Sequence, residues 1–194
     1  MGSPRNRLSS RRSIRLKDFD YSSAGAYLIT ICVQDRGLLL GDVVGGEVAL
    51  WMEGQIVHEV WDGLVGRFPT VMTDAFVVMP NHVHGIVVID GDHVGVPTDQ
   101  PVGQRAGAMN RAPTPSSSKP GQDEFASPSL GEVIRVLKAV STRRIREVGD
   151  PSFGWQRNYH ERVIRDEREF ERARAYIEAN PARWAEDVEN PRGR

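Results

Sequence analysis

Two apolar runs divided by a proline make up the stretch Val77-Val78-Met79-Pro80-Asn81-His82-Val83-His84-Gly85-Ile86-Val87-Val88-Ile89. Runs rich in β-branched residues are typical of buried strands. The break at Pro80-Asn81 predicts two strands, over 73–79 and 82–89, joined by a bulge or a tight turn. Side chains alternate between the faces of a strand, so His82 and His84 point the same way and Val83 points the opposite way.

The two histidines are candidate metal ligands. They lie about 7 Å apart along the strand, which allows both imidazoles to converge on one divalent ion. Two unpaired imidazoles buried in an apolar run would otherwise cost desolvation free energy. Gly85 behind the pair predicts a close backbone approach at the site. A His-x-His pattern alone is equally compatible with a polar strand face, so that alternative stays open.

The segments on either side carry the periodicity of a mixed fold. Apolar spacing, caps and turn residues predict a strand over 26–33, a hairpin over 38–50 that turns at Gly45-Gly46, a helix over 51–64, a helix from Ser129 to Gly149, and a helix that starts at Asp166 with Glu169 as its capping partner and ends before Pro181. This order predicts an α+β fold, a sheet with helices packed on one face.

The composition excludes several classes of protein. Cys32 is the single cysteine among 194 residues, so the chain has neither a disulfide framework nor a cysteine-based zinc site. No segment approaches the roughly 18 consecutive apolar residues of a membrane span. We therefore expect a cytoplasmic protein with no membrane partner.

The net charge of −1 hides an uneven distribution of charge. Residues 1–17 contain six cations and no anions, whereas residues 18–90 contain two cations and ten anions. We expect 1–17 to be a flexible basic arm. The segment 91–128 contains six of the twelve prolines and few large apolar side chains, and it is expected to be a long flexible insertion loop.

The motif Met79-Pro80-Asn81-His82-Val83-His84-Gly85 resembles the His-hydrophobic-His motif of the IS200-like single-tyrosine (HUH) transposases. Trp155-Gln156, Tyr159-His-Glu-Arg-Val-Ile-Arg165 and Tyr176-Ile-Glu-Ala-Asn-Pro181 are similar to the branch called REP-associated tyrosine transposases. The resemblance covers most of the chain, and it implies a single domain over 18–190. It also implies a ferredoxin-like antiparallel sheet with an extra N-terminal hairpin and a C-terminal helix that carries a tyrosine.

The resemblance implies an enzyme that cuts single-stranded DNA with a divalent metal, Mg²⁺ or Mn²⁺, and forms a 5′-phosphotyrosine bond. By position, Tyr176 resembles the nucleophile and Asn180, four residues later, resembles a metal ligand beside His82 and His84. Tyr159 is the alternative nucleophile, and its other reading is packing or base stacking. Some relatives carry a histidine where this chain has Arg162, so that position receives no role.

Basic residues supply candidate DNA contacts. The helix after the loop carries a cationic flank, and the arm carries further arginines; the candidates are Arg135, Lys138, Arg143, Arg144, Arg146, Arg12 and Arg15. A solvated face is the alternative reading of such a flank. Members of the branch recognise palindromic repeats folded as hairpins, so the expected partner is single-stranded or hairpin DNA at the nucleoid.

Two other functions remain open. A domesticated relative would bind hairpin DNA without cutting it, and a His-x-His metal site could instead serve a small-molecule hydrolase or lyase. The sequence leaves open whether the protein is a monomer or a homodimer that exchanges the tyrosine helix.

Overall fold

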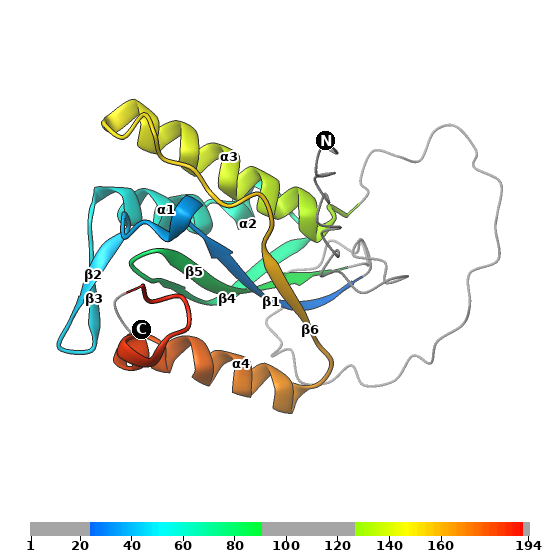
Figure 1. Ribbon diagram of the computed structural model, residues 1–194. Coiled ribbons are helices and arrows are strands. Elements are labelled where there is room, and N and C mark those ends of the chain that lie inside the picture. The colour runs from blue at the N-terminus through cyan, green and yellow to red at the C-terminus, as the bar shows by residue number, and fades with distance from the viewer. Residues whose placement is uncertain (1–23, 91–126, 192–194) are drawn as a thin grey trace, which may run out of the picture.

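A computed structural model describes residues 24–90 and 127–191 (Figure 1). The predicted arm at 1–17, with Arg12 and Arg15, lies outside the described residues, as does nearly all of the predicted insertion loop at 91–128.

Within the described residues the main sheet has four strands in the order β4-β5-β1-β6, and each neighbouring pair is antiparallel. The strands are β1 (Gly25–Cys32), β4 (Val71–Val78), β5 (His82–Ile89) and β6 (His160–Ile164). The apolar strand β5 is buried along nearly its whole length, as expected for a strand with both faces covered. In the register of β1 and β5, Cys32 lies opposite His82 and Thr30 lies opposite His84.

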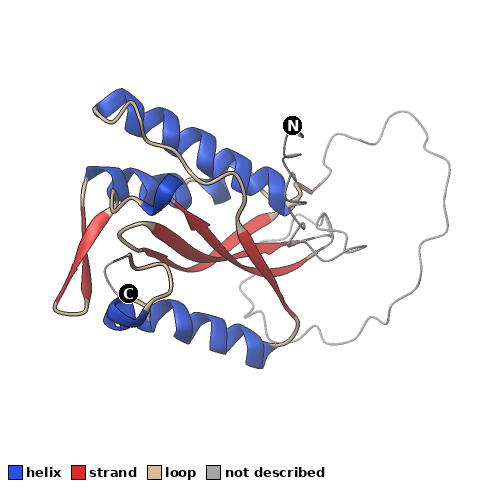
Figure 2. Ribbon diagram, viewed as in Figure 1, coloured by secondary structure: helices blue, strands red, loops and turns tan. Residues whose placement is uncertain are grey.

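Helices cover both faces of this sheet (Figure 2). On one face lie α1 (Met52–Asp62) and α3 (Leu130–Val148), with the short α2 (Leu64–Arg67) after α1. On the other face lies α4 (Glu167–Ala179), which is followed by a 3₁₀ helix over Pro181–Glu186. The predicted α+β class and the antiparallel sheet are confirmed.

One detail of that prediction differs, because α4 does not share a face with the other helices. Ile86 of β5 packs against Ile177 of α4 in a second apolar cluster, separate from the core under α1 and α3. The sheet therefore has two apolar faces, and each requires a covering layer.

The predicted caps and hairpin are confirmed. The backbone N–H of Glu132 donates to the Ser129 hydroxyl at 3.2 Å, and that of Glu169 donates to the Asp166 carboxylate at 2.7 Å. The hairpin consists of β2 (Gly41–Val44) and β3 (Glu47–Leu50). Gly45 and Gly46 both have positive φ angles, which glycine adopts without steric cost.

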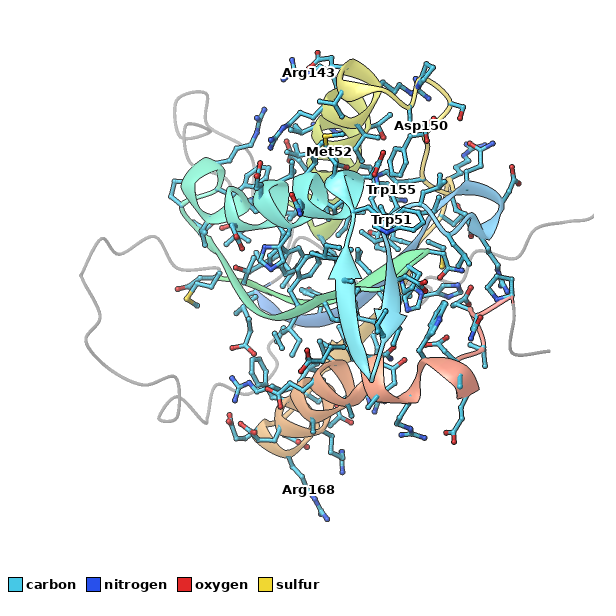
Figure 3. The ribbon with its side chains drawn as sticks, turned by 90° about the vertical axis from the view of Figure 1, so that its left-hand side faces the viewer. Trp51, Met52, Arg143, Asp150, Trp155 and Arg168 are labelled. Carbon is cyan, nitrogen blue, oxygen red and sulfur yellow. The ribbon has the colours of Figure 1, made fainter. Side chains whose placement is uncertain are left out.

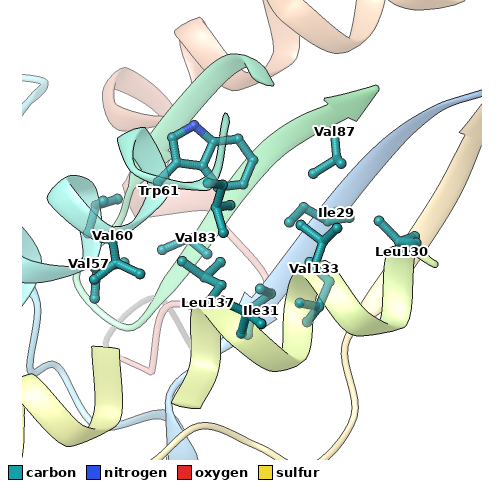
Figure 4. Packing of buried hydrophobic residues seen from close by; sticks show 14 of the residues in the cluster. Ile29, Ile31, Val57, Val60, Trp61, Val83, Val87, Leu130, Val133 and Leu137 are labelled. Atoms are coloured by element: carbon teal, nitrogen blue, oxygen red, sulfur yellow. The ribbon is translucent and has the colours of Figure 1, made fainter. Parts of the chain in front are cut away.

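Gly85 serves the core rather than the histidine site. Side chains of α1 and α3 converge on one face of β1 and β5 (Figure 4). The indole of Trp61 lies so close to Gly85 that an added Cβ would be 2.5 Å from its Cη2 atom. The prediction that this glycine admits close approach at the site was wrong, because position 85 faces away from His82 and His84.

Candidate metal and tyrosine site

His82 and His84 lie on the face of β5 that α4 covers. Their side chains are buried, and their Nε2 atoms are 3.0 Å apart. Burial lowers the pKa of His82 to about 4 and that of His84 to about 3. Both imidazoles are therefore neutral at pH 7, which is the form that binds a metal ion.

The Nδ1 nitrogen of each imidazole has a hydrogen-bond partner. Nδ1 of His82 is 2.8 Å from Oδ1 of Asn81, and Nδ1 of His84 is 2.8 Å from the hydroxyl of Thr30. Since the Asn81 Oδ1 can only accept, Nδ1 of His82 carries the proton and its Nε2 keeps a lone pair. Partners of this kind fix the tautomer and orientation of metal-binding histidines.

Asp187 completes a group of three possible ligands. Its Oδ2 lies 3.8 Å from Nε2 of His82, and the ligand atoms of His82, His84 and Asp187 all lie within 4.8 Å of one another. Asp187 comes directly after the 3₁₀ helix that follows α4. Sequence reasoning missed it, because no spacing within the chain relates it to the histidines.

The segment that carries Asp187 is held next to the histidine motif. Asn81 Nδ2 donates to the backbone carbonyl of Glu189 at 2.7 Å, and the Glu189 carboxylate pairs with Arg36 at 3.1 Å. The backbone N–H of Glu189 donates to Oδ1 of Asp187 at 2.7 Å. One carboxylate oxygen of Asp187 is thus occupied, and the other faces His82.

Tyr176 lies on α4 at the edge of this group. Its Oη is 3.3 Å from Nε2 of His84, and the two rings meet edge to face. Burial raises the pKa of the phenol above its usual 10.0 and the charge of Asp187 raises it further, while the Asn180 side chain and Arg183 lower it. Nearly half of the residue's surface is exposed, so water and a substrate can reach it.

Asn180 ends α4, and its side chain is buried. Its Oδ1 atom has no hydrogen-bond partner among the described residues. Together with Tyr176 and Asp187 it lines a pocket of about 190 Å³. A buried acceptor without a partner is costly, so this oxygen has a reason to bind a cation.

These donors fit a divalent ion. Two ligands about 2.1 Å from one ion and at right angles lie about 3.0 Å from each other, which matches the separation of the histidine Nε2 atoms. The carboxylate and amide oxygens suit Mg²⁺ or Mn²⁺, whereas the two imidazoles suit ions such as Zn²⁺ or Fe²⁺ as well. The residues present therefore fit a divalent metal ion, and the donor set does not select one metal.

The structure brings His82, His84 and Tyr176 together but places Tyr159 elsewhere. Tyr159 packs against the core that lies under α1 and α3, and the Lys138 ammonium sits 5.4 Å from the centre of its ring. It also lines a groove of about 960 Å³ along α3.

The candidate DNA contacts on α3 have different environments. Arg135, Lys138, Arg143 and Arg146 line the groove, beside Trp155. Arg143 and Trp155 are seen at one side of the molecule in Figure 3, and Arg168 of α4 is seen at the other. Arg144 instead pairs with Glu59 of α1. Lys138 donates to the carbonyls of Gln156, Arg157 and Asn158, so its ammonium holds the chain in place.

One relative matches this sequence over most of its length. An uncharacterized protein of Haemophilus influenzae is 36% identical over 177 residues, which cover 91% of each protein. The chain belongs to the family of this Haemophilus protein. No model of a known protein family matches the sequence.

Two solved structures are similar to this chain. A REP-associated tyrosine transposase bound to a REP hairpin superimposes with a TM-score of 0.53 at 16% identity, over 88% of this chain and 74% of that one. A presumed transposase of Deinococcus radiodurans gives a TM-score of 0.44 at 15% identity, over 84% and 95% of the two chains. The first likeness shows a shared fold. Among the described residues, no helix combines the length and apolarity needed to cross a membrane.

Proposed function

We propose that the protein is a metal-dependent endonuclease and strand transferase that acts on single-stranded DNA in hairpin-forming repeats. One observation carries the proposal: the Tyr176 hydroxyl lies 3.3 Å from Nε2 of His84, within a group of residues that can hold a metal. The fold is that of a transposase whose structure contains a hairpin. The sequence motifs around His82 and Tyr176 support the same activity.

The reaction proposed for Tyr176 is a transesterification. Its Oη attacks the phosphorus, an Oη–P bond forms, and the bond from phosphorus to the 3′ oxygen breaks. The phenol proton passes to solvent water, which reaches the half-exposed side chain, and the departing 3′ oxygen takes a proton from water. The phosphotyrosine ester keeps the strand activated for rejoining.

His82, His84 and Asp187 would hold the ion, with Asn180 as a further oxygen ligand. When bound, a divalent cation neutralises charge on the phosphate and favours the ionised phenol. That help matters because burial and Asp187 raise the pKa of Tyr176. Asn180 and Arg183 act in the opposite direction and favour the phenolate.

The test is a covalent-adduct assay. Labelled hairpin DNA with single-stranded tails of mixed sequence is incubated with the protein and Mn²⁺, and the products are separated on a denaturing gel. We expect a DNA–protein adduct that Tyr176→Phe abolishes and Tyr159→Phe retains.

Each other result selects a different function. Binding without an adduct would indicate a hairpin-binding protein that does not cut. Absence of DNA affinity would contradict both DNA-based functions and leave a small-molecule metal enzyme. Loss of the adduct in Tyr159→Phe, with Tyr176→Phe active, would show that the nucleophile is misassigned.

A further inference from the structure

A second pocket adjoins Tyr176 on the side away from Asp187. It lies between α4, β1 and β6 and has a volume of about 320 Å³. Its lining comprises Leu28, Thr30, Arg162, Ile164, Glu169, Arg172, Ala173 and Tyr176. Ligand pockets begin at about 300 Å³, so this one is large enough for a single small group such as one nucleotide.

The floor of the pocket is apolar and connects to the histidine pair. Leu28 and Ile164 come from neighbouring strands and belong to the apolar layer beneath α4. Thr30 lines the pocket as well, and its hydroxyl is 2.8 Å from Nδ1 of His84. A group bound here would therefore contact the residue that orients a candidate metal ligand.

The rim of the pocket carries two arginines and the carboxylate of Glu169. Arg172 precedes Tyr176 by four residues on α4, so the two side chains project from successive turns about 6 Å apart along the helix axis. No hydrogen bond or ion pair joins the side chain of Arg172 to any other described residue. Within the described part of the chain, the side chain of Arg162 on β6 has a single ion pair, a 3.5 Å contact with Glu169, and two thirds of it is exposed.

Three of the five candidate cations on α3 make other contacts, whereas Arg135 and Arg143 have side chains that are 69% and 71% exposed. Lys138 uses its ammonium on three backbone carbonyls, and Arg144 pairs with Glu59. Arg146 donates to the carbonyl of Phe153 at 3.0 Å. A strand that reaches Tyr176 meets Arg162 and Arg172 first, since α3 covers the opposite face of the sheet.

We propose that the pocket between α4 and β6 binds one nucleotide of single-stranded DNA next to the phosphate that Tyr176 attacks. The base packs on Leu28 and Ile164, and the neighbouring phosphate lies between the guanidinium groups of Arg162 and Arg172. This assignment rests on the proposed function, and it gives Arg162 the role of a DNA contact.

The first test measures binding without cleavage, in the Tyr176→Phe background. A fluorescent single-stranded 20-mer of mixed sequence is titrated by anisotropy at several salt concentrations. Arg172→Gln is expected to weaken binding several-fold and to reduce the slope of log affinity against log salt by about 0.7, the contribution of one phosphate contact. Arg67→Gln, an exposed arginine of α2, is the matched control and should change neither quantity.

The second test uses the adduct assay with proteins that retain Tyr176. Substrates with one abasic site at each position around the cut should reveal one flanking position where loss of the base lowers adduct formation about tenfold, as expected when apolar contact with Leu28 and Ile164 is lost. In Leu28→Ala the same abasic site should cost clearly less, because the base then has little left to contact.

The outcomes separate this proposal from the function on which it rests. An adduct that forms normally in both Arg162→Gln and Arg172→Gln would contradict nucleotide binding in the pocket, and the endonuclease proposal would still stand. If the wild type forms no adduct, the endonuclease proposal fails and the anisotropy result decides whether the pocket binds a strand. A larger binding loss in Arg143→Gln than in Arg172→Gln would place the strand on α3 and overturn the proposal.

Discussion

At the scale of single residues, the candidate metal site depends on how Asp187 is held. Its Oδ1 accepts the backbone N–H of Glu189, and Glu189 is fixed by Asn81 and Arg36. The Oδ1 atom of Asn81 in turn accepts a hydrogen bond from Nδ1 of His82. One asparagine therefore orients a histidine and anchors the segment that brings the carboxylate to it, so the group is preorganised for an ion.

Asp187→Asn is predicted to weaken binding of Mn²⁺ at least tenfold, because even outer-shell partners of a metal site contribute about 10–100-fold to affinity. Isothermal titration with Mn²⁺ measures the change. Glu186→Gln removes the same charge one residue earlier, from a side chain that is outside the three-ligand group, and should leave the affinity nearly unchanged. Equal losses in the two variants would mean that Asp187 acts only through general electrostatics.

Sequence reasoning identified the parts of this site that a short motif encodes. His82 and His84 share a strand face because strand geometry requires it, and Tyr176 with Asn180 was assigned by resemblance. The role of Asp187 could not be predicted from the sequence, because its position depends on how the chain folds back after Pro181. Nothing in the local pattern records that Asn81 binds the carbonyl of Glu189, 108 residues away.

Gly85→Ala is predicted to destabilise the fold by about 1–3 kcal/mol, the usual cost of overpacking a core. The new Cβ would lie 2.5 Å from Cη2 of Trp61, a rigid ring that is itself stacked on Phe76. Urea unfolding measures the loss. The control is Gly66→Ala in α2, where an added Cβ meets nothing within 4 Å. Equal stability of the two variants would contradict the account of Gly85.

At the scale of elements, α4 is docked on the sheet by packing and by ion pairs, of which that of Arg174 lies nearest to Tyr176. Ala173 and Ile177 bury against the sheet, and Arg174 makes two 2.9 Å hydrogen bonds to the two carboxylate oxygens of Asp74 on β4. Arg174 lies two residues before Tyr176, so the pair fixes the position of the helix close to the phenol. The hydrogen bond from Arg174 lowers the pKa of Asp74 below its usual 3.8.

Asp74→Asn is predicted to lower the free energy of unfolding by about 0.5–1 kcal/mol, since the pair is partly exposed. It should also slow adduct formation. Because the folded-state pKa of Asp74 is lowered, its stabilisation is fully present above the unfolded-state value and is lost as pH falls below about 3.8. The difference between wild type and Asp74→Asn in urea unfolding should therefore be constant from pH 5 to 7 and shrink toward pH 3.

Asp42→Asn on β2 is the comparison for this pair, since Asp42 has no ion pair with any described residue. A pH-independent difference in stability for Asp74→Asn, or one no larger than for Asp42→Asn, would contradict the role assigned to the Arg174 contact.

Elements with a clear periodicity were predicted well, and the exception is instructive. Ser129 and Asp166 cap their helices as expected, because a capping side chain acts within one turn. The strand β6 was missed. Its sequence, His-Glu-Arg-Val-Ile, has two apolar residues at one end and no alternation, so only its pairing with β1 makes it a strand.

At the scale of the whole molecule, three distant segments of one chain meet at the site. β5 provides the histidines, α4 provides Tyr176, and the turn after the 3₁₀ helix provides Asp187. All three contacts form within a single copy, with α4 packed on its own sheet. We predict that Tyr176 acts with the candidate ligands of its own chain, a question that the sequence left undecided.

Mixing two inactive variants tests this directly. His82→Ala lacks a candidate ligand and Tyr176→Phe lacks the candidate nucleophile, so each alone should form no adduct. A mixture that was unfolded and refolded together should also stay inactive if α4 remains on its own chain, whereas exchange of the helix would restore about a quarter of the sites by random pairing of chains. His84→Ala paired with Tyr176→Phe repeats the experiment with the other histidine of β5, and light scattering gives the molar mass in each case. Recovery of the adduct in either mixture would show that the tyrosine acts between chains.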